Sequence, residues 1–184
     1  YEWVEAYSIR RWGFHGSSHS YIAMKMKALA PEARRILSVH LGGSCSICAI
    51  KDGKSIAASM GATPQSGIFH NNRVGDFDVF CMPRLCREYG DLETVLGKLS
   101  KQGGFSGITG KSNDLREVLR LEKEGDKRAA LAVNAFVDSI LGYIGMYTAY
   151  LGGVDAIVFT GGIGWKSAEI RKRVCEKCTF LNVK

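Results

Sequence analysis

The chain has 184 residues, of which 46% are hydrophobic, and a formal net charge of +7 at pH 7. This length suits one domain with a substantial core, and no uninterrupted apolar run approaches the roughly 18 residues of a membrane span. The basic residues are scattered, and the densest cluster, residues 170–178, alternates with apolar residues as a solvated helix face does. The composition therefore disfavours a nucleic-acid-binding module and favours an anionic small-molecule partner.

The N-terminal stretch and the cysteines indicate a cytoplasmic protein. Charges interrupt "YEWVEAYSIRRW" where a signal peptide would be apolar, so we expect no export signal, and the missing initiator Met suggests a piece of a longer protein. Cys45 and Cys48 fall in a predicted strand, and Cys175 and Cys178 fall in a predicted helix. Neither pair has the glycine-containing turn of a zinc knuckle, so we expect free thiols in a reducing compartment.

The first third of the chain predicts a helix followed by a meander. Residues 17–30 have apolar side chains at helical spacing, with Ser17 or Ser18 as the N-cap. Residues 36–60 then read as three consecutive strands, and Asp52 begins an Asp-Gly pair that is a strong hairpin signal. We therefore expect an antiparallel meander behind the first helix.

The rest of the chain predicts a long loop, a run of helices and a closing strand–turn–helix unit. Residues 61–78 are rich in Gly, Asn and Ser, and long loops in compact domains tend to be functional. Helical patterns cover residues 76–89, 91–101, 112–124 and 126–151, and an apolar strand, a glycine-rich turn and a helix follow from residue 154. This order indicates a single α/β domain with a mixed sheet.

Two glycine-bearing turns are candidates for a nucleotide site. "TGGIGWKS", residues 160–167, joins a strand to a helix, where backbone N–H groups can approach a phosphate or a polar nucleotide group. "HLGGSCS", residues 40–46, joins two strands and can present N–H groups in the same way. Each turn alone could serve packing only. Together they fit a fold that clasps a nucleotide from two sides, as in the actin/sugar-kinase/Hsp70 superfamily.

"GFHGSSHSY", residues 13–21, contains the two most conspicuous histidines. His15 and His19 are four residues apart, which places them on one helix face. The same spacing occurs in metal-binding pairs. A metal site, a catalytic histidine and a helix cap all remain open on these residues alone.

Five stretches occur in the order and spacing of the acetate kinase (acetokinase) family, and the resemblance runs over about residues 1–180. They are "RRWGFHGSSHSYIA", "VHLGGSCSICAIKDGKSIAASMGATPQSG", "RVGDFD", "GITGKSNDLRE" and "YLGGVDAIVFTGGIGWKSAEIRKRVCE". The resemblance implies a ribonuclease H-like (actin-like ATPase) α/β fold, with residues 1–184 as the C-terminal nucleotide-binding half of a two-domain kinase. The implied reaction converts acetate and ATP to acetyl phosphate and ADP.

The resemblance also implies site residues. His15 and Arg73 would be catalytic, because a histidine and a guanidinium can stabilise the transferring phosphoryl group. On this basis His15 is better read as a phosphoryl contact than as a metal ligand, His19 is a supporting or helix-face residue, and His70 has no assignment. The implied nucleotide-binding residues are His40, Gly42, Gly43 and Ser44 in the phosphate hairpin, Asp114, Leu115 and Arg116 beside adenosine, and Gly162, Ile163 and Gly164 beneath adenine. His40 ends a buried strand, and the pattern alone favours a structural role for it.

The sequence departs from the family pattern at three places. The family hairpin usually reads HLGNGS, but here Gly43 stands in place of Asn and Ser44 in place of Gly, which removes an amide contact to phosphate. The family loop usually reads MGTRSGD, but here it reads "FHNNRVGD" and keeps Arg73. Trp165 and Lys166 replace two polar neighbours of the adenine turn. These departures weigh against efficient catalysis.

Other parts of the family pattern fall outside this chain. The resemblance implies an N-terminal domain with the carboxylate pocket, a C-terminal segment with a glutamate associated with Mg²⁺, and a homodimer formed through this domain. We therefore expect ATP or ADP to bind, the Mg²⁺ ligands to lie outside the chain, and the chain alone to be inactive on acetate. The alternatives are a non-catalytic relative that binds nucleotide or a partner, and a propionate or butyrate kinase.

Overall fold

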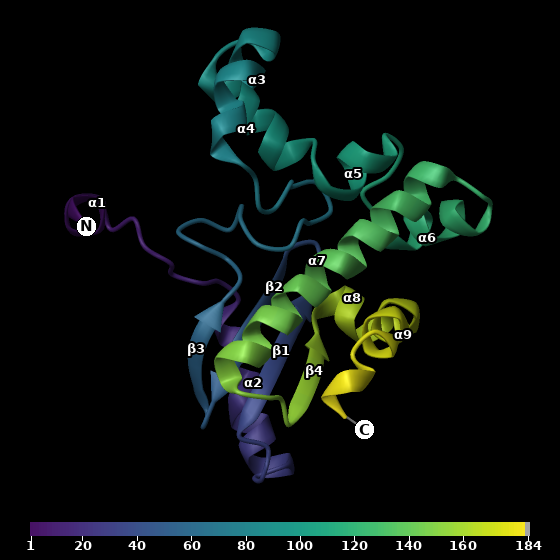
Figure 1. Ribbon diagram of the computed structural model, residues 1–184. Helices are drawn as coiled ribbons and strands as arrows, with labels where there is room; N and C mark the ends of the chain where they lie inside the picture. Colours follow the sequence, from purple (N-terminus) through teal and green to yellow (C-terminus); the bar gives the residue numbers. More distant parts are fainter. Residues whose placement is uncertain (183–184) are drawn as a thin grey trace.

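The computed structural model describes residues 1–182, which are built on a four-stranded mixed sheet (Figure 1). Strands β1 (Arg35–Leu41), β2 (Cys45–Lys51) and β3 (Lys54–Ala58) form an antiparallel meander, and β4 (Ala156–Thr160) pairs in parallel with β1. The strand order is β3-β2-β1-β4. The predicted meander and the predicted mixed sheet are both confirmed.

The β2–β3 hairpin forms where the Asp-Gly signal predicts it. Asp52 has a φ of 51° and Gly53 a φ of 77°. Two successive positive φ angles define the turn whose twist matches paired strands, and Asp-Gly adopts it readily. The turn fixes the register of β2 against β3.

Helices cover both faces of the sheet. The longest, α7 (Lys127–Leu151), crosses the face that is nearer the viewer in Figure 1, and α2 (Gly16–Leu29) packs against β1 from the other face. By length and composition α7 could also cross a membrane, but a continuous side of it is buried in the core against the sheet and the neighbouring helices. That side consists of Ala129, Ala132, Val133, Phe136, Val137, Ile140, Ile144, Tyr147 and Leu151.

The remaining helices pack beside this centre or extend away from it. They are α1 (Glu2–Tyr7), α3 (Met82–Tyr89), α4 (Leu92–Lys101), α5 (Gly104–Thr109), α6 (Leu115–Lys123), α8 (Gly161–Lys166) and α9 (Ala168–Glu176), with short 3-10 turns at Val79–Cys81 and Thr179–Leu181. In Figure 1, α3 and α4 extend away from the sheet at the top, and α1 lies on an N-terminal arm. Helices α1 and α5 are absent from the sequence prediction.

Three predicted helix starts are wrong by a few residues. Helix α2 begins at Gly16 with His15 as its N-cap and no side-chain capping bond, so the expected caps Ser17 and Ser18 lie inside the helix, where the Ser18 hydroxyl contacts His40. Helix α6 begins after Asp114, whose carboxylate accepts the backbone N–H of Arg116. The helix predicted over 76–89 begins only at residue 79, because the preceding loop turns back on itself.

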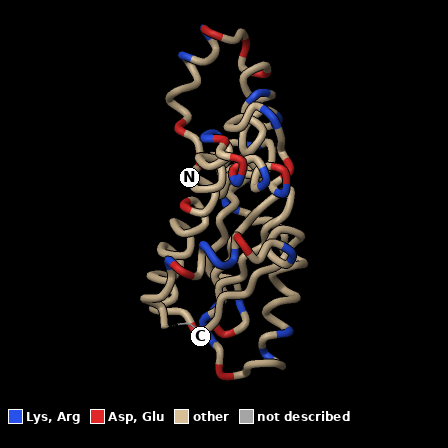
Figure 2. Tube along the Cα trace, turned by 90° about the vertical axis from the view of Figure 1, so that its right-hand side faces the viewer, with Lys and Arg blue, Asp and Glu red and all other residues tan. Residues whose placement is uncertain are grey.

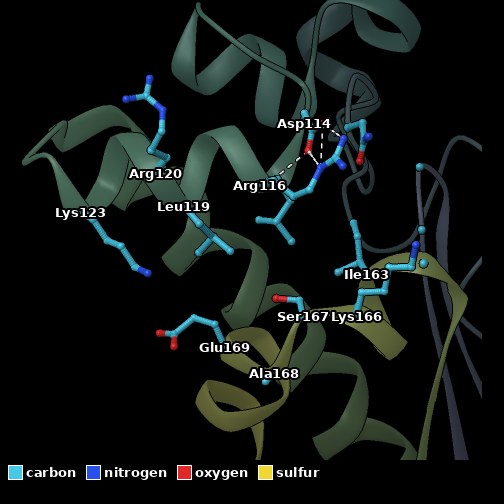
Figure 3. Close-up of a pocket in the computed structure, with 15 residues that line it drawn as sticks. Asp114, Arg116, Leu119, Arg120, Lys123, Ile163, Lys166, Ser167, Ala168 and Glu169 are labelled. Atoms are coloured by element: carbon cyan, nitrogen blue, oxygen red, sulfur yellow. Dashed lines mark hydrogen bonds and ion pairs between the residues drawn. The ribbon is translucent and has the colours of Figure 1, made fainter.

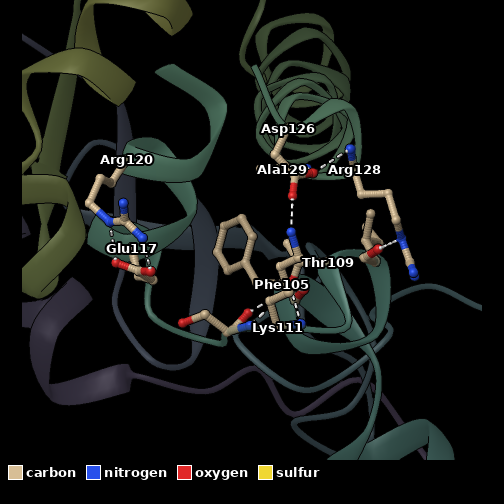
Figure 4. A network of polar contacts seen from close by, with 10 residues as sticks. Phe105, Thr109, Lys111, Glu117, Arg120, Asp126, Arg128 and Ala129 are labelled. Atoms are coloured by element: carbon tan, nitrogen blue, oxygen red, sulfur yellow. Dashed lines mark hydrogen bonds and ion pairs between the residues drawn. The ribbon is translucent and has the colours of Figure 1, made fainter. Parts of the chain in front are cut away.

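A polar network joins α5 and the segment after it to the start of α7 (Figure 4). Asp126 caps α7 by accepting the N–H groups of Arg128 and Ala129, and it also pairs with Lys111 at 2.5 Å. Arg128 in turn donates to the carbonyl of Ile108 at the end of α5. These contacts hold the end of α5 and the beginning of the segment that leads to α6 against the start of α7.

The net positive charge is not gathered on one face. In Figure 2, Lys and Arg segments are interspersed with Asp and Glu segments along the trace. Many of the basic side chains form ion pairs, including Arg35 with Asp155 at 2.5 Å and Arg173 with Glu122 at 2.8 Å. This arrangement agrees with the prediction of scattered charge.

Candidate functional site

A cavity of about 720 Å³ opens between the β1–β2 hairpin, α6 and the α8–α9 segment (Figure 3). Its size falls within the ~300–1,000 Å³ range of small-molecule sites. Three separate parts of the chain that were predicted as nucleotide-binding meet in its lining. The predicted residues among the lining are Gly42, Gly43, Asp114, Leu115, Arg116, Gly162 and Ile163.

The cavity combines apolar walls with basic side chains. Leu119 on α6 and Ala168 at the start of α9 lie on opposite sides of it in Figure 3, and Ile163 adds a third apolar surface. Lys123 and Lys166 also line it. Apolar walls suit a flat aromatic base, and nearby ammonium groups suit an anionic tail.

Asp114 and Arg116 are organised by helix capping. The Asp114 carboxylate accepts the backbone N–H of Arg116 at 2.9 Å and also pairs with its guanidinium at 2.5 Å. Because the guanidinium and these hydrogen bonds stabilise the charged form, the pKa of the Asp114 carboxyl is lowered. The pair forms a fixed polar edge of the cavity.

The predicted glycine-rich turn after β4 is a short helix instead. Helix α8 begins at Gly161, directly after β4, and Gly161 has a φ of +74°. Gly162 faces open space and lines the cavity, whereas Gly164 is buried against Phe159. Trp165 is 72% exposed and does not line the cavity.

Four histidines and an arginine gather on the other side of the hairpin. The rings of His15 and His40 stack with centroids 4.1 Å apart, and His15 Nδ1 lies 2.8 Å from Ser46 Oγ. Arg73 donates to the Pro64 carbonyl at 3.0 Å and to the Ser44 hydroxyl at 3.4 Å. The two predicted catalytic residues, His15 and Arg73, are thus brought to the same hairpin.

His19 is a buried, fully bonded residue and not an exposed helix-face histidine. Its Nδ1 lies 2.8 Å from Ser38 Oγ and its Nε2 lies 2.8 Å from Ser46 Oγ. Because Ser46 also contacts His15, the serine hydroxyl links the two imidazoles. His19 therefore orients Ser46, and through it His15.

The histidines of this cluster favour the neutral state. Burial is the main cause that lowers the pKa of His15 to about 4, and the neighbouring His40 and Arg73 add to it. Burial and His40 lower the pKa of His19 to about 4 as well. With its Nδ1 held by Ser46, a neutral His15 can present Nε2 to a ligand.

The hairpin connects the cavity with the histidine cluster. A Cβ on Gly42 would lie 3.7 Å from His40 Nε2, and Gly42 also lines the cavity. His40 is held from below by Ser18, whose hydroxyl lies 2.9 Å from its Nδ1. The hairpin residues thus have the cavity on one side and the candidate catalytic residues on the other.

A metal centre finds no support in residues 1–182. No group of three or more His, Cys, Asp or Glu side chains in this part of the chain could hold a metal ion. The cavity carboxylates are already paired, Asp114 with Arg116 and Glu169 with Arg173. The donors that are described here therefore do not fit a Mg²⁺ site.

The six cysteines are free thiols.

Sequence reasoning missed several site residues. Ser38 and Ser46 were not predicted, and they share one face of β1 and β2 with the predicted His40, which lies directly opposite Ser46 in the register. Polar residues at alternate positions of otherwise apolar strands are a period-two signal that could have been used. Asn71 and Glu169 also line the cavity, but nothing in their local sequence marks them.

The chain combines three features of an actin-like ATPase domain. Its mixed sheet carries a meander, helices cover both faces of the sheet, and a cavity lies between the β1–β2 hairpin and the β4–α8 junction. The family model of the acetokinases matches residues 1–184. This chain belongs to the acetokinase family.

Individual relatives agree with this assignment. Acetate kinase of Shouchella clausii is 46% identical over 187 residues, which cover 100% of this chain and 47% of that protein. The crystal structure of Porphyromonas gingivalis acetate kinase matches with a TM-score of 0.93 and 36% identity, covering 98% of this chain and 46% of the other. A propionate kinase from Francisella tularensis matches with a TM-score of 0.93 and 37% identity, covering 98% and 47%. The chain thus spans about half the length of these relatives.

Proposed function

We propose that this chain is the C-terminal nucleotide-binding half of a two-domain kinase that transfers a phosphoryl group from ATP to a short carboxylate. The observation that carries the proposal is the convergence of residues from the hairpin, α6 and α8 on one cavity. These segments are far apart in the sequence, and the cavity combines surfaces for a base with surfaces for an anion. A nucleotide is the ligand class that needs both.

In this proposal the nucleotide phosphates lie over Gly42 and Gly43 and point toward His15 and Arg73. The Arg73 guanidinium would balance the charge of the transferring phosphoryl group, and neutral His15 would donate from Nε2 to one of its oxygens. Both groups are held in place beforehand, His15 by Ser46 and Arg73 by the Pro64 carbonyl. Preorganised donors are the main contribution that a protein makes to phosphoryl transfer.

Acetate is the first candidate for the acceptor, because the compared proteins include an acetate kinase with 46% identity over the whole chain. The match to a propionate kinase keeps propionate as a second candidate. The carboxylate pocket and the Mg²⁺ ligands are proposed to lie outside this chain. A cytoplasmic homodimer is the proposed setting.

A charge placed in the cavity should abolish nucleotide binding. We expect Mg·ADP to bind the chain with a Kd in the micromolar to millimolar range, about −4 to −8 kcal/mol. The substitution Gly162→Asp should remove this binding, because its carboxylate would enter the cavity lining and repel the phosphates. Isothermal titration calorimetry measures the Kd of Mg·ADP for the unaltered chain and for Gly162→Asp.

Gly142→Asp is the matched control for that titration. Gly142 lies exposed on α7, outside the cavity, and no atom lies within 4 Å of the point that its Cβ would occupy. The control should bind as the unaltered chain does. If the unaltered chain binds neither Mg·ADP nor adenosine, the nucleotide proposal fails, and a non-catalytic relative that binds only a partner becomes the better account.

The isolated chain should form no acetyl phosphate from acetate and Mg·ATP. Phosphoryl transfer depends on positioning the acceptor, and the proposed acceptor pocket belongs to the half of the relatives that this chain does not cover. An assay for acetyl phosphate with the purified chain tests this. Appreciable turnover would contradict the proposed division between the two halves.

A further inference from the structure

The loop before α3 contains an asparagine whose backbone is rigidly held. The carbonyls of residues 70, 71 and 72 accept the N–H groups of Phe105, Ser106 and Gly103, at 3.2, 3.0 and 2.9 Å. Three successive carbonyls are thus fixed by the start of α5. A loop held in this way keeps the side chain of Asn71 at one place on the cavity wall.

That side chain is unpaired among residues 1–182. Asn71 lines the cavity together with Gly42 and Gly43, and its carboxamide forms no hydrogen bond to a described residue. Its Oδ1 is buried without a partner. Buried polar atoms in folded proteins are nearly always paired, so the unpaired Oδ1 points to a bound water or another donor, and the Nδ2 of the same carboxamide, which has no acceptor among the described residues, is free to donate to a ligand.

The carboxamide faces the hairpin position that lacks a side chain. Asn71 Nδ2 lies 3.9 Å from where a Cβ on Gly43 would be, and no other atom lies within 4 Å of that point. The resemblance described above implies an asparagine in the hairpin where this chain has Gly43. In this chain an asparagine, Asn71, stands instead in the loop across the same gap.

A fully buried histidine fixes the distance between the two segments. The backbone N–H of Cys45 donates to His70 Nδ1 at 2.7 Å, and the His70 side chain has no exposed surface. This bond joins the loop to the end of the hairpin next to Gly43. The gap between Asn71 and Gly43 therefore has a defined width.

We propose that Asn71 Nδ2 donates a hydrogen bond to a phosphate oxygen of the nucleotide that lies over Gly42 and Gly43. In this way the loop supplies the amide that the hairpin lacks, and it does so from the other side of the proposed phosphate position. The inference rests on the proposed nucleotide function. It adds a phosphate-binding residue that the local hairpin sequence does not reveal.

An exchange experiment tests the proposal. Mg·ADP and adenosine are each titrated into the unaltered chain, Asn71→Gly, the double variant Gly43→Asn/Asn71→Gly, and Asn72→Ala as the matched control. Asn72 is the neighbouring asparagine and does not line the cavity. Thermal unfolding followed by circular dichroism verifies that every variant is folded.

Asn71→Gly should weaken Mg·ADP about 10- to 100-fold, as expected for a hydrogen bond to a charged group. It should leave adenosine unchanged, because adenosine has no phosphate. The double variant should recover most of the lost affinity, and Asn72→Ala should bind normally. If Asn71→Gly proves unfolded, Asn71→Asp has nearly the same shape and should weaken Mg·ADP selectively through charge repulsion.

Three results would overturn the inference, and they can be told apart. Equal Mg·ADP affinity of the unaltered chain and a folded Asn71 variant overturns the role of Asn71 alone and leaves the nucleotide site standing. An equal loss for adenosine and Mg·ADP also removes the phosphate contact, since the variant would then act on the whole cavity. Failure of the unaltered chain to bind either ligand overturns the proposed function together with the inference.

Discussion

Gly161→Ala should destabilise the chain by about 2–5 kcal/mol and remove nucleotide binding. Gly161 has a φ of +74°, which costs a residue with a Cβ roughly 1–2 kcal/mol. Its Cβ would also lie 2.3 Å from the carbonyl oxygen of Leu41, and overpacking of this kind typically costs about 1–3 kcal/mol more. Leu41 cannot easily move, because it ends a strand that is paired on both sides.

The loss of binding follows from the position of this contact. Gly161 begins α8, and the next two residues of α8 line the cavity. Leu41 leads directly into the hairpin residues Gly42 and Gly43. A shift that relieves the clash therefore separates the two sides of the proposed nucleotide site.

Gly162→Ala is the matched control for stability. No atom lies within 4 Å of its Cβ position and its φ is not positive, so an alanine fits. Alanine in a helix is more stable than glycine by roughly 0.5–1 kcal/mol. Urea unfolding followed by circular dichroism should therefore show a lower midpoint for Gly161→Ala only. Equal midpoints for both variants would mean that β4 and α8 do not meet with this geometry.

The sequence predicts the parts of the fold whose signals are local. The Asp-Gly pair at Asp52 determines a hairpin through backbone angles of two adjacent residues, so the meander could be predicted well. The helix from Lys127 to Leu151 has a long apolar periodicity, and its predicted and observed bounds differ by one residue at the start. Each of these two signals is contained in a single continuous stretch of the chain.

Helix α5 could not be predicted, because it depends on distant partners. Its sequence, "GFSGIT", contains two glycines, which disfavour helix by about 1 kcal/mol each relative to alanine. The structure offsets this cost through bonds to the carbonyls of residues 70–72 and through the burial of Phe105 against Phe69 and Phe136. Such contacts join parts of the chain that are more than 30 residues apart.

The candidate site shows the same division. The cavity glycines Gly42, Gly43 and Gly162 could be predicted from motifs, because a glycine-bearing turn directly after a strand lets the backbone approach a ligand closely. The pairing of His19 with Ser38 and Ser46 requires knowledge of which face of β1 meets α2. The role of Asn71 requires knowledge that its loop faces the hairpin. Both depend on the assembled fold.

Lowering the pH from 7 to 4 should remove several kcal/mol of stability. The pKa values of His15, His19 and His70 are lowered to about 4 in the folded chain, whereas an unfolded histidine has a pKa of about 6.5. Between these values the unfolded chain binds more protons, so the free energy of unfolding falls as the pH falls. The stabilisation is fully present above about pH 6.5 and is lost by about pH 4.

Asp126 and Asp155 do not account for a loss in this window. The carboxyl groups of Asp126 and Asp155, whose pKa values are lowered to about 2 by their basic partners and by hydrogen bonds, lose their contribution only as the pH falls from about 4 toward 2. A typical domain has about 5–15 kcal/mol of stability in total. We therefore expect much of it to be lost before these two aspartates titrate.

His70→Asn isolates the contribution of one histidine. Burial, Arg73 and His15 together lower the pKa of His70, and protonation of its Nδ1 would remove the acceptor of the Cys45 N–H. An asparagine oxygen can accept that bond and cannot be protonated in this range. Urea unfolding at several pH values between 4.5 and 6 gives the slope of the free energy of unfolding against pH. This slope should be smaller in His70→Asn than in the unaltered chain by about one proton, or about 1.4 kcal/mol per pH unit. Equal slopes for His70→Asn and the unaltered chain would show that protonation of His70 does not destabilise the folded chain. The hairpin would then not depend on a neutral imidazole at this position.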